Sequence, residues 1–168
     1  ALPLSIIVRV LQNLLQEKIP VRDIRTIAET LTEHAIKTQH PLDLTEAVRT
    51  AMGRLIVQQI IGFQQELPII TLSPALEQIL QKSIQNQNRG EPTFVLEPNL
   101  INRLQASIKD CQAKQELSNQ PTIIVVSPVL RYPLSQLIRN LFQNIFVLSF
   151  SEIPQDKQIK ITATLGDK

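Results

Sequence analysis

Three times in the second half of this chain, a short apolar run ends in serine or glutamate followed by proline, and a helical pattern then begins. The junctions are Ser73-Pro74, Glu97-Pro98 and Ser127-Pro128. Proline suits the first position of a helix because the N–H that it lacks would be unbonded there. Strands that alternate with helices need crossover connections, which favour a parallel sheet. Residues 67–168 are therefore predicted to form a small α/β domain with a mostly parallel mixed sheet.

The predicted strands are short apolar runs, together with one alternating segment. Residues 68–72, 94–96, 124–126 and 146–148 are apolar, whereas 159–165 alternates apolar and polar side chains. Such alternation is typical of an edge strand with one face in solvent. The last segment is therefore expected at an edge of the sheet, with its apolar residues on one face.

Residues 1–66 show only helical spacing and are predicted to form an all-helical module of three helices. The predicted helices cover residues 3–18, 21–37 and 43–63. Asp43 and Glu46 fit a capping box at the start of the third helix, because an N-cap acceptor is followed three residues later by an acid. The domain boundary is placed between residues 66 and 67.

Composition excludes several classes of protein. Hydrophobic residues make up 43% of the chain and charged residues 19%, as in ordinary folded proteins. The 17 Lys and Arg against 15 Asp and Glu, with no basic stripe, argue against nucleic-acid binding. No apolar run approaches the roughly 18 residues of a membrane span, so no membrane contact by this segment is expected. Cys111 is the single cysteine, which excludes an internal disulfide and suggests a core residue.

The strand-to-helix turns are poor phosphate sites. A phosphate loop presents several backbone N–H groups, with glycines that let the anion approach closely. Each turn here contains proline and no glycine; the glycines are Gly53, Gly62, Gly90 and Gly166. Ser73 and Ser127 are expected to cap helices instead. A small nucleotide-binding α/β enzyme domain stays open as an alternative, supported only by the alternation of strands and helices.

No catalytic or metal-binding constellation is predicted either. His34 and His40 are separated by a helix end, and no cysteine or acid pair accompanies them in sequence. Glu46 and Glu152 are isolated carboxylates, and Ser127 lacks the glycine-flanked elbow of a serine nucleophile. The chain is therefore predicted to be no enzyme and to hold no cofactor or metal.

One helix start carries more charge than helix formation explains. Arg22, Asp23 and Arg25 lie together at the predicted start of the second helix. The positive end of the helix dipole favours the aspartate but disfavours each arginine, by about 0.3–1 kcal/mol at exposed sites. The three residues are therefore predicted to form a subunit or domain interface. The alternative is pairing of the arginines with acids of the same module, such as Glu29 or Glu46.

Six short sequence blocks match a known family of proteins. They occur in the same order as in that family and extend over nearly the whole chain, so the match is specific. They are Leu11–Leu15, Ile19–Ile27, Leu44–Arg49, Leu67–Leu72, Val126–Arg131 and Val147–Pro154. With these blocks the chain resembles the C-terminal part of the cytoplasmic domain of bacterial type III export-gate proteins, the FlhA/InvA/LcrD family. The last two blocks are more like flagellar than virulence members. Ser73 stands where the family usually has aspartate, Phe150 where tyrosine is frequent, and Asn144-Ile145-Phe146 where a Leu-Pro entry is common.

The resemblance implies a non-enzymatic module of the flagellar protein export gate. Family members form homo-oligomeric rings at the cytoplasmic face of the inner membrane, anchored by an upstream membrane region. They receive chaperone–cargo complexes delivered from the associated ATPase complex. The helical module would then contribute ring contacts and the α/β domain would switch the state of the gate, while the main chaperone-binding surface lies outside this chain. The equivalent subunit of a virulence secretion system is the alternative.

Overall fold

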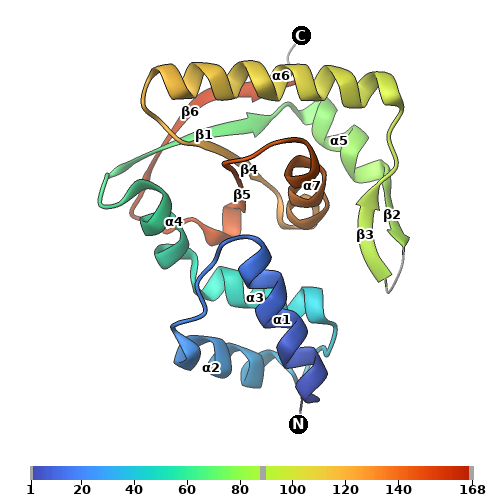
Figure 1. Ribbon diagram of the computed structural model, residues 1–168, viewed down its shortest axis with the longest axis vertical. Helices are drawn as coiled ribbons and strands as arrows, with labels where there is room; N and C mark the ends of the chain where they lie inside the picture. The colour runs from blue at the N-terminus through green and yellow to red at the C-terminus, as the bar shows by residue number, and fades with distance from the viewer. Residues whose placement is uncertain (1, 88–89, 167–168) are drawn as a thin grey trace. The chain divides into compact units, whose positions relative to one another are not determined.

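The chain divides into two compact units, Ala1–Ile60 and Ile61–Lys168. The computed structural model describes residues 2–87 and 90–166 (Figure 1). The first unit is helical and the second is an α/β layer, so the predicted fold class is confirmed. The domain boundary between residues 66 and 67 stays a prediction.

The N-terminal unit is built around helix α3. Its helices are α1 (Leu4–Gln16), α2 (Ile24–His34), α3 (Pro41–Ala51) and α4 (Gly53–Ile61), the last of which ends just past the division. Both α1 and α2 pack on α3. The apolar side chains buried on these three helices are Val10, Leu14, Ile27, Leu31, Leu42, Leu44 and Val48. Asn13 Nδ2 also donates to Thr45 Oγ1 at 3.1 Å, which joins α1 to α3 through a buried polar contact.

The third predicted helix is two helices, and its predicted capping box is wrong. Helix α3 begins at Pro41, and its N-cap is His40, whose Nδ1 accepts from Leu42 N at 3.3 Å. Proline at the first helical position outweighs the Asp43 signal because its fixed φ already suits a helix. Met52 then leaves helical geometry at ψ 13°, and α4 starts at the next residue.

The C-terminal unit contains a four-stranded, wholly parallel sheet. Its strands are β1 (Glu66–Leu72), β4 (Thr122–Val126), β5 (Ile145–Ser149) and β6 (Gln158–Leu165), in the order β5-β4-β1-β6. Each neighbouring pair runs in the same direction. Helices α5 (Pro74–Lys82), α6 (Pro98–Leu117) and α7 (Pro128–Leu141) each begin at one of the predicted prolines. The proline-led junctions therefore identified all three helix starts.

One predicted strand does not belong to this sheet. Residues 94–96 were expected to enter it, but β3 (Glu91–Phe94) instead pairs with β2 (Ile84–Gln87) in a separate antiparallel hairpin. An antiparallel hairpin needs only a short turn, whereas insertion into the parallel sheet would require another crossover. The connection from β1 to β4 therefore contains α5, the hairpin and α6.

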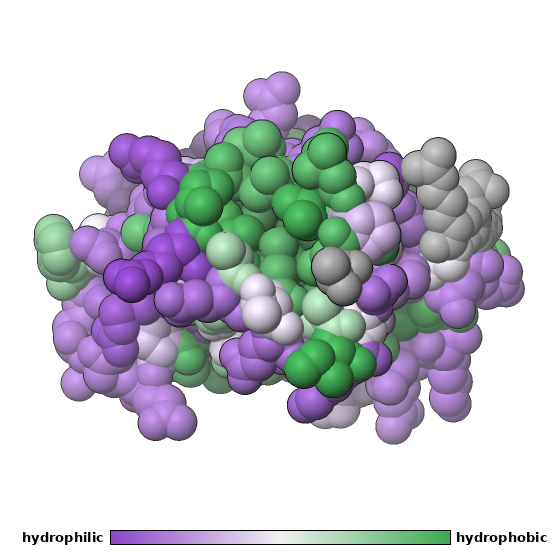
Figure 2. Space-filling view, turned by 90° about the horizontal axis from the view of Figure 1, so that it is seen from below, coloured by the Kyte–Doolittle hydropathy of each residue, from purple (hydrophilic) through white to green (hydrophobic). Residues whose placement is uncertain are grey.

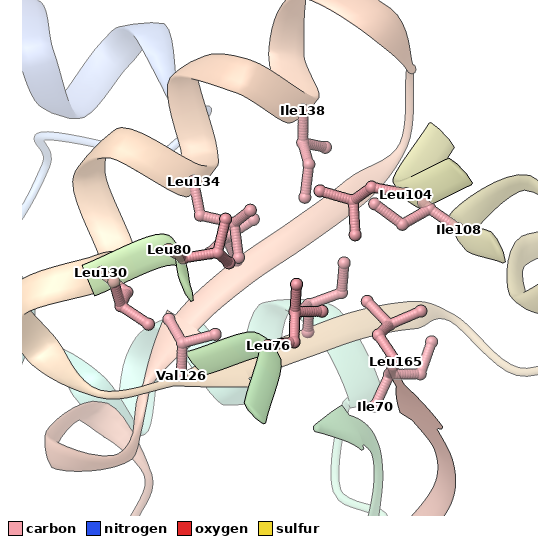
Figure 3. Close-up of a cluster of buried hydrophobic side chains, with 12 residues drawn as sticks. Ile70, Leu76, Leu80, Leu104, Ile108, Val126, Leu130, Leu134, Ile138 and Leu165 are labelled. Carbon is pink, nitrogen blue, oxygen red and sulfur yellow. The ribbon is translucent and has the colours of Figure 1, made fainter. Parts of the chain in front are cut away.

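The core lies between the sheet and the three helices. Figure 3 shows this cluster, to which the strands contribute Ile70, Ile124, Val126, Val147 and Leu165 and the helices Leu76, Leu80, Leu104, Ile108, Leu130, Leu134 and Ile138. Successive strands β1, β4 and β5 are added in one direction across the sheet. Right-handed crossovers between such strands place their helices on the same face, which accounts for one shared core.

Strand β6 occupies an edge as predicted, but its apolar residues do not share one face. Ile161 pairs with Ile69, and Ala163 pairs with the next residue of β1, so Thr162 is an extra residue in β6. This bulge sends Ile161 and Ala163 to opposite sides of the sheet. Ile159 and Ile161 are consequently 47% and 60% exposed, whereas Leu165 is buried in the core.

A buried ion pair ties helix α7 to the segment after β5. Arg131 Nε lies 3.8 Å from Glu152 Oε2, and the two side chains are only 0% and 1% exposed. Arg131 Nη1 also donates to Val147 O at 3.3 Å, and Glu152 Oε1 accepts from Ser149 N at 3.2 Å. Both charges thus have further hydrogen bonds, which buried ions need to offset their lost hydration.

Glu152→Ala tests this pair. It leaves the Arg131 guanidinium buried without its counter-charge, and loss of one partner of such a pair costs about 3–5 kcal/mol of unfolding free energy. Urea denaturation of the fragment measures the loss, with Glu116→Ala on the exposed surface of α6 as control. A double variant, Arg131→Met with Glu152→Leu, should recover part of the loss. Equal stability of Glu152→Ala and the control would contradict a structural role for the pair.

Gly166→Ala tests the contact between the end of β6 and the start of α5. Gly166 has φ 89°, and an added Cβ would lie 2.6 Å from Ser73 Oγ and 2.8 Å from Leu76 Cβ. Backbone strain and overpacking together should cost about 2–4 kcal/mol. Gly62 has φ 65° with nothing within 4 Å of an added Cβ, so Gly62→Ala is the matched control; it should cost about 1–2 kcal/mol. Equal losses at both positions, measured by thermal unfolding, would show that the close approach contributes nothing.

Candidate functional site

The three predicted interface residues lie together at the start of α2, but they do not all belong to its first turn. Asp23 is the N-cap, and Arg22 precedes it outside the helix, so only Arg25 lies in the first turn. Thr26 N donates to Asp23 Oδ1 at 3.1 Å, and Thr26 Oγ1 donates to Asp23 Oδ2 at 2.7 Å. Asp23 therefore has a local role in beginning the helix.

The same contacts stabilise the charged form of Asp23. The hydroxyl of Thr26, the backbone N–H of Thr26 and the positive charge of Arg25 all lower the pKa of this carboxyl group, in that order of size. A hydrogen bond to a carboxylate favours its ionised form. Helix capping thus accounts for the aspartate without any partner.

The two arginines differ in their contacts. Arg25 Nε lies 3.4 Å from Glu29 Oε1, one helical turn later, and these side chains are 89% and 72% exposed. Such a surface pair contributes about 0–1 kcal/mol. Arg22 is exposed and forms no ion pair within residues 2–87 and 90–166. Pairing within the module therefore accounts for Arg25 in part and leaves Arg22 unexplained.

Exposed apolar side chains occur on both α1 and α2. Ile24, between the two arginines, is 57% exposed, and Leu4, Val8 and Leu15 are exposed on α1. Figure 2, which views the molecule from below, shows a patch of hydrophobic side chains near the middle of the view. The signal in the sequence was the breadth of the apolar pattern of α1, which exceeds what one buried face needs.

Of the two serines predicted to cap helices, the structure confirms one and contradicts the other. Ser73 Oγ accepts from Leu76 N at 3.1 Å, which confirms it as a cap. Ser127 occupies the N-cap of α7, but its hydroxyl does not cap the helix and has no hydrogen-bond partner in the described part of the chain. Cys111 packs against the core from α6, as expected, and burial raises the pKa of its thiol.

The histidines and carboxylates have structural positions as well. His40 caps α3, and His34 lies in the last turn of α2. Glu152, which was predicted to be an isolated carboxylate, is paired with Arg131, twenty-one residues earlier in the chain. The only sign of this in the sequence was that both residues lie in blocks that resemble the family. Among the described residues, no three His, Cys, Asp or Glu side chains form a group suited to a metal ion.

Comparison with known proteins decides the family. The profile of the FHIPEP family matches residues 1–158. The chain belongs to the FHIPEP family. It is 41% identical over 160 residues to flagellar biosynthesis protein FlhA of Salmonella typhimurium, which is 95% of this chain and 22% of that protein. It is 34% identical over 170 residues to harpin secretion protein HrpI of Erwinia amylovora, again covering 22% of the relative.

Solved structures show the same architecture. The Chlamydia pneumoniae CdsV protein superposes with a TM-score of 0.87 at 26% identity, covering 97% of this chain and 46% of CdsV. The nonameric SctV-C of EPEC gives a TM-score of 0.85 at 27% identity, with 98% and 49% coverage. A complex of CdsV with CdsO gives 0.85 at 25% identity, with 97% and 48% coverage. This FHIPEP chain therefore spans about half of these solved chains.

One further finding concerns membranes. Within residues 2–87 and 90–166, no helix is both long enough and apolar enough to cross a bilayer.

Asp23→Ala tests the capping role. The variant should lower the melting temperature of the fragment, because Thr26 N loses its acceptor, whereas Asp23→Asn should retain most of the stability. The lowered pKa of Asp23 adds a pH signature. Its contribution is present above the pKa of an unfolded aspartate and is lost as the pH falls through the lower folded value. Thermal unfolding of wild type and Asp23→Asn between pH 2 and pH 6 measures this; identical pH profiles would contradict it.

Proposed function

We propose that this FHIPEP chain is a non-enzymatic C-terminal cytoplasmic module of a flagellar type III protein export gate. The observation that carries the proposal is the 41% identity to FlhA over 95% of the chain. The similarity to HrpI, at 34%, keeps a virulence secretion system as the alternative. By the same relation the module works at the cytoplasmic face of the bacterial inner membrane, as part of a membrane-anchored protein.

Self-assembly into a ring is the first part of the proposed role. Solved relatives of this fold include the nonameric SctV-C and the nonameric cytosolic domain of EscV. In this chain, the start of α2 offers a contact surface with Arg22, Ile24 and Arg25 exposed together. Arg22 forms no ion pair with the described residues of its own unit. This supports a role for Arg22 in contact between subunits or domains.

Contact with other export-apparatus proteins is the second part. The complex of CdsV with CdsO supports such a contact for a relative of the same fold. For this chain the proposed partners are the ATPase complex and chaperone–cargo complexes, whose main binding surface lies outside residues 1–168. The α/β unit is proposed as the part that switches the state of the gate.

The nucleotide-binding alternative gains no support from the strand-to-helix turns. Each of helices α5, α6 and α7 has proline in its first turn, where a phosphate site needs backbone N–H groups.

Arg22→Glu with Arg25→Glu tests the proposed interface. The fragment should keep its melting temperature to within about 2 °C, because surface ion pairs contribute little. The full-length protein should lose ring assembly, seen by electron microscopy of membranes, and flagellar protein export. The matched control is Arg103→Glu with Lys109→Glu, which makes the same change of charge on exposed positions of α6.

Two outcomes would contradict the proposal. A large fall in the stability of the fragment would show that the arginines serve its internal fold. Equal loss of assembly in the α6 control would show that total charge, rather than the start of α2, governs the ring.

A further inference from the structure

Strand β6 has an open outer edge. It lies beside β1 at one end of the four-stranded sheet (Figure 1), and no strand in the described part of the chain pairs with its other side. Its first five residues, 158–162, are all exposed. Leu165, at its other end, belongs instead to the core together with Leu104 and Ile108 of α6. The first half of β6 is therefore accessible along its outer edge.

The hydrogen bonds of β6 show which of its main-chain groups point outward. Gln158 N donates to Gln65 O at 3.0 Å, so the main-chain groups of Gln158 face β1. Successive residues of a strand direct these groups to alternate sides. Those of Ile159 and Ile161 therefore point away from β1, and the described residues supply no backbone partner for either. Each of the two residues offers one N–H donor and one C=O acceptor to an incoming strand.

The same two residues expose apolar side chains on one face of the sheet. Ile159 and Ile161 are 47% and 60% exposed, and they share the face of Leu67 and Ile69, their partners on β1. Leu67 and Ile69 are buried, so the two isoleucines extend this apolar face to the edge of the sheet. An added strand with apolar residues at alternate positions would cover them, and such cross-strand pairs stabilise a sheet.

Two features that protect many sheet edges are present here, but they leave part of this edge open. Native edge strands often contain a lysine or a bulge that discourages pairing with other chains. The bulge at Thr162 comes after Ile161, so residues 158–161 keep regular pairing with β1. Lys160 is the one charged residue among these four, and its side chain lies on the face opposite the isoleucines. Residues 158–161 can therefore accept a strand.

Lys160 also indicates which charge that strand should carry. Its Nζ lies 4.0 Å from Glu66 Oε1 on β1, and the two side chains are 63% and 59% exposed. Among the described residues, no other carboxylate pairs with Lys160. A carboxylate on the outer side of Lys160 would add a favourable cross-strand pair, whereas a lysine there would be repelled. Residues 158–165 contain no Asp or Glu, so a second copy of β6 would not supply this carboxylate.

We propose that the outer edge of β6 binds an extended segment of another protein as an added strand of the sheet. The segment has apolar residues at alternate positions, which contact Ile159 and Ile161, and a carboxylate beside Lys160. Main-chain hydrogen bonds supply affinity and the side chains supply selectivity, as in other additions of a strand to an exposed sheet edge. The inference goes beyond the proposed function, which assigns no partner to this edge.

A labelled peptide tests the edge directly on the chain of residues 1–168. In this probe valine alternates with threonine, and one central threonine is replaced by glutamate. Fluorescence anisotropy should show saturable binding. Methylation of alternate backbone nitrogens of the peptide should abolish binding for the set that faces β6 and should change affinity by less than about threefold for the other set. Equal affinities of the two methylated peptides, or no saturable binding of the parent peptide, would overturn the inference.

Variants of β6 locate the bound peptide. Ile161→Pro removes an N–H that β1 does not use and puts a ring where the added strand would lie, so affinity should fall about tenfold or more. Ile161→Thr keeps the N–H and should cost about threefold. Lys160→Glu should weaken binding of the glutamate probe about threefold and favour a probe with lysine at that position. Unchanged affinity of a folded Ile161→Pro variant would overturn the inference; if this variant does not fold, the methylated peptides decide.

The outcomes also distinguish other occupants and the proposed function. A dimer in sedimentation that Ile161→Pro abolishes, without binding of the probe, would make a second copy the occupant and overturn the inference. None of these measurements depends on rings or on export. Failure of peptide binding therefore leaves the proposed function standing, and failure of the predicted assembly defect in the Arg22 and Arg25 variant leaves the β6 site standing.

Discussion

The parallel pairing of β1 with both β4 and β6 is the constraint on which the α/β unit depends. Parallel strands need crossovers, and the strands β1, β4 and β5 are added in one direction, so α5, α6 and α7 share a face and one core. The last strand must then return to the opposite edge. The Arg131–Glu152 pair secures the segment from which this return begins, because it joins the end of β5 to α7.

Local chemistry in the sequence was sufficient for most of the fold. Proline after a strand predicted all three helix starts of the α/β unit, since one residue both ends the strand and suits the helix. The errors arose where two local signals compete. Pro41 with His40 begins α3, although Asp43 and Glu46 offered a better-known capping pattern. The hairpin of β2 and β3 was missed because pairing partners are not visible in a single strand.

The position of the three charged residues at a helix start was predictable from the sequence, but their contacts were not, and their use as an interface stays a prediction. A charge cluster at a helix start is visible in the sequence, but the contacts of each residue are visible only in the structure. Asp23 caps the helix by accepting from Thr26, Arg25 pairs with Glu29, and Arg22 does neither.

Surface charges at the start of α2 suit a contact that must not form everywhere. Exposed ion pairs contribute about 0–1 kcal/mol each, too little to hold isolated subunits together. In the proposed export gate, anchoring the subunits in one membrane would raise their effective concentration. Weak individual contacts would then support assembly only where the anchored copies are gathered, so the proposed role makes assembly depend on the membrane-bound context rather than on this module alone.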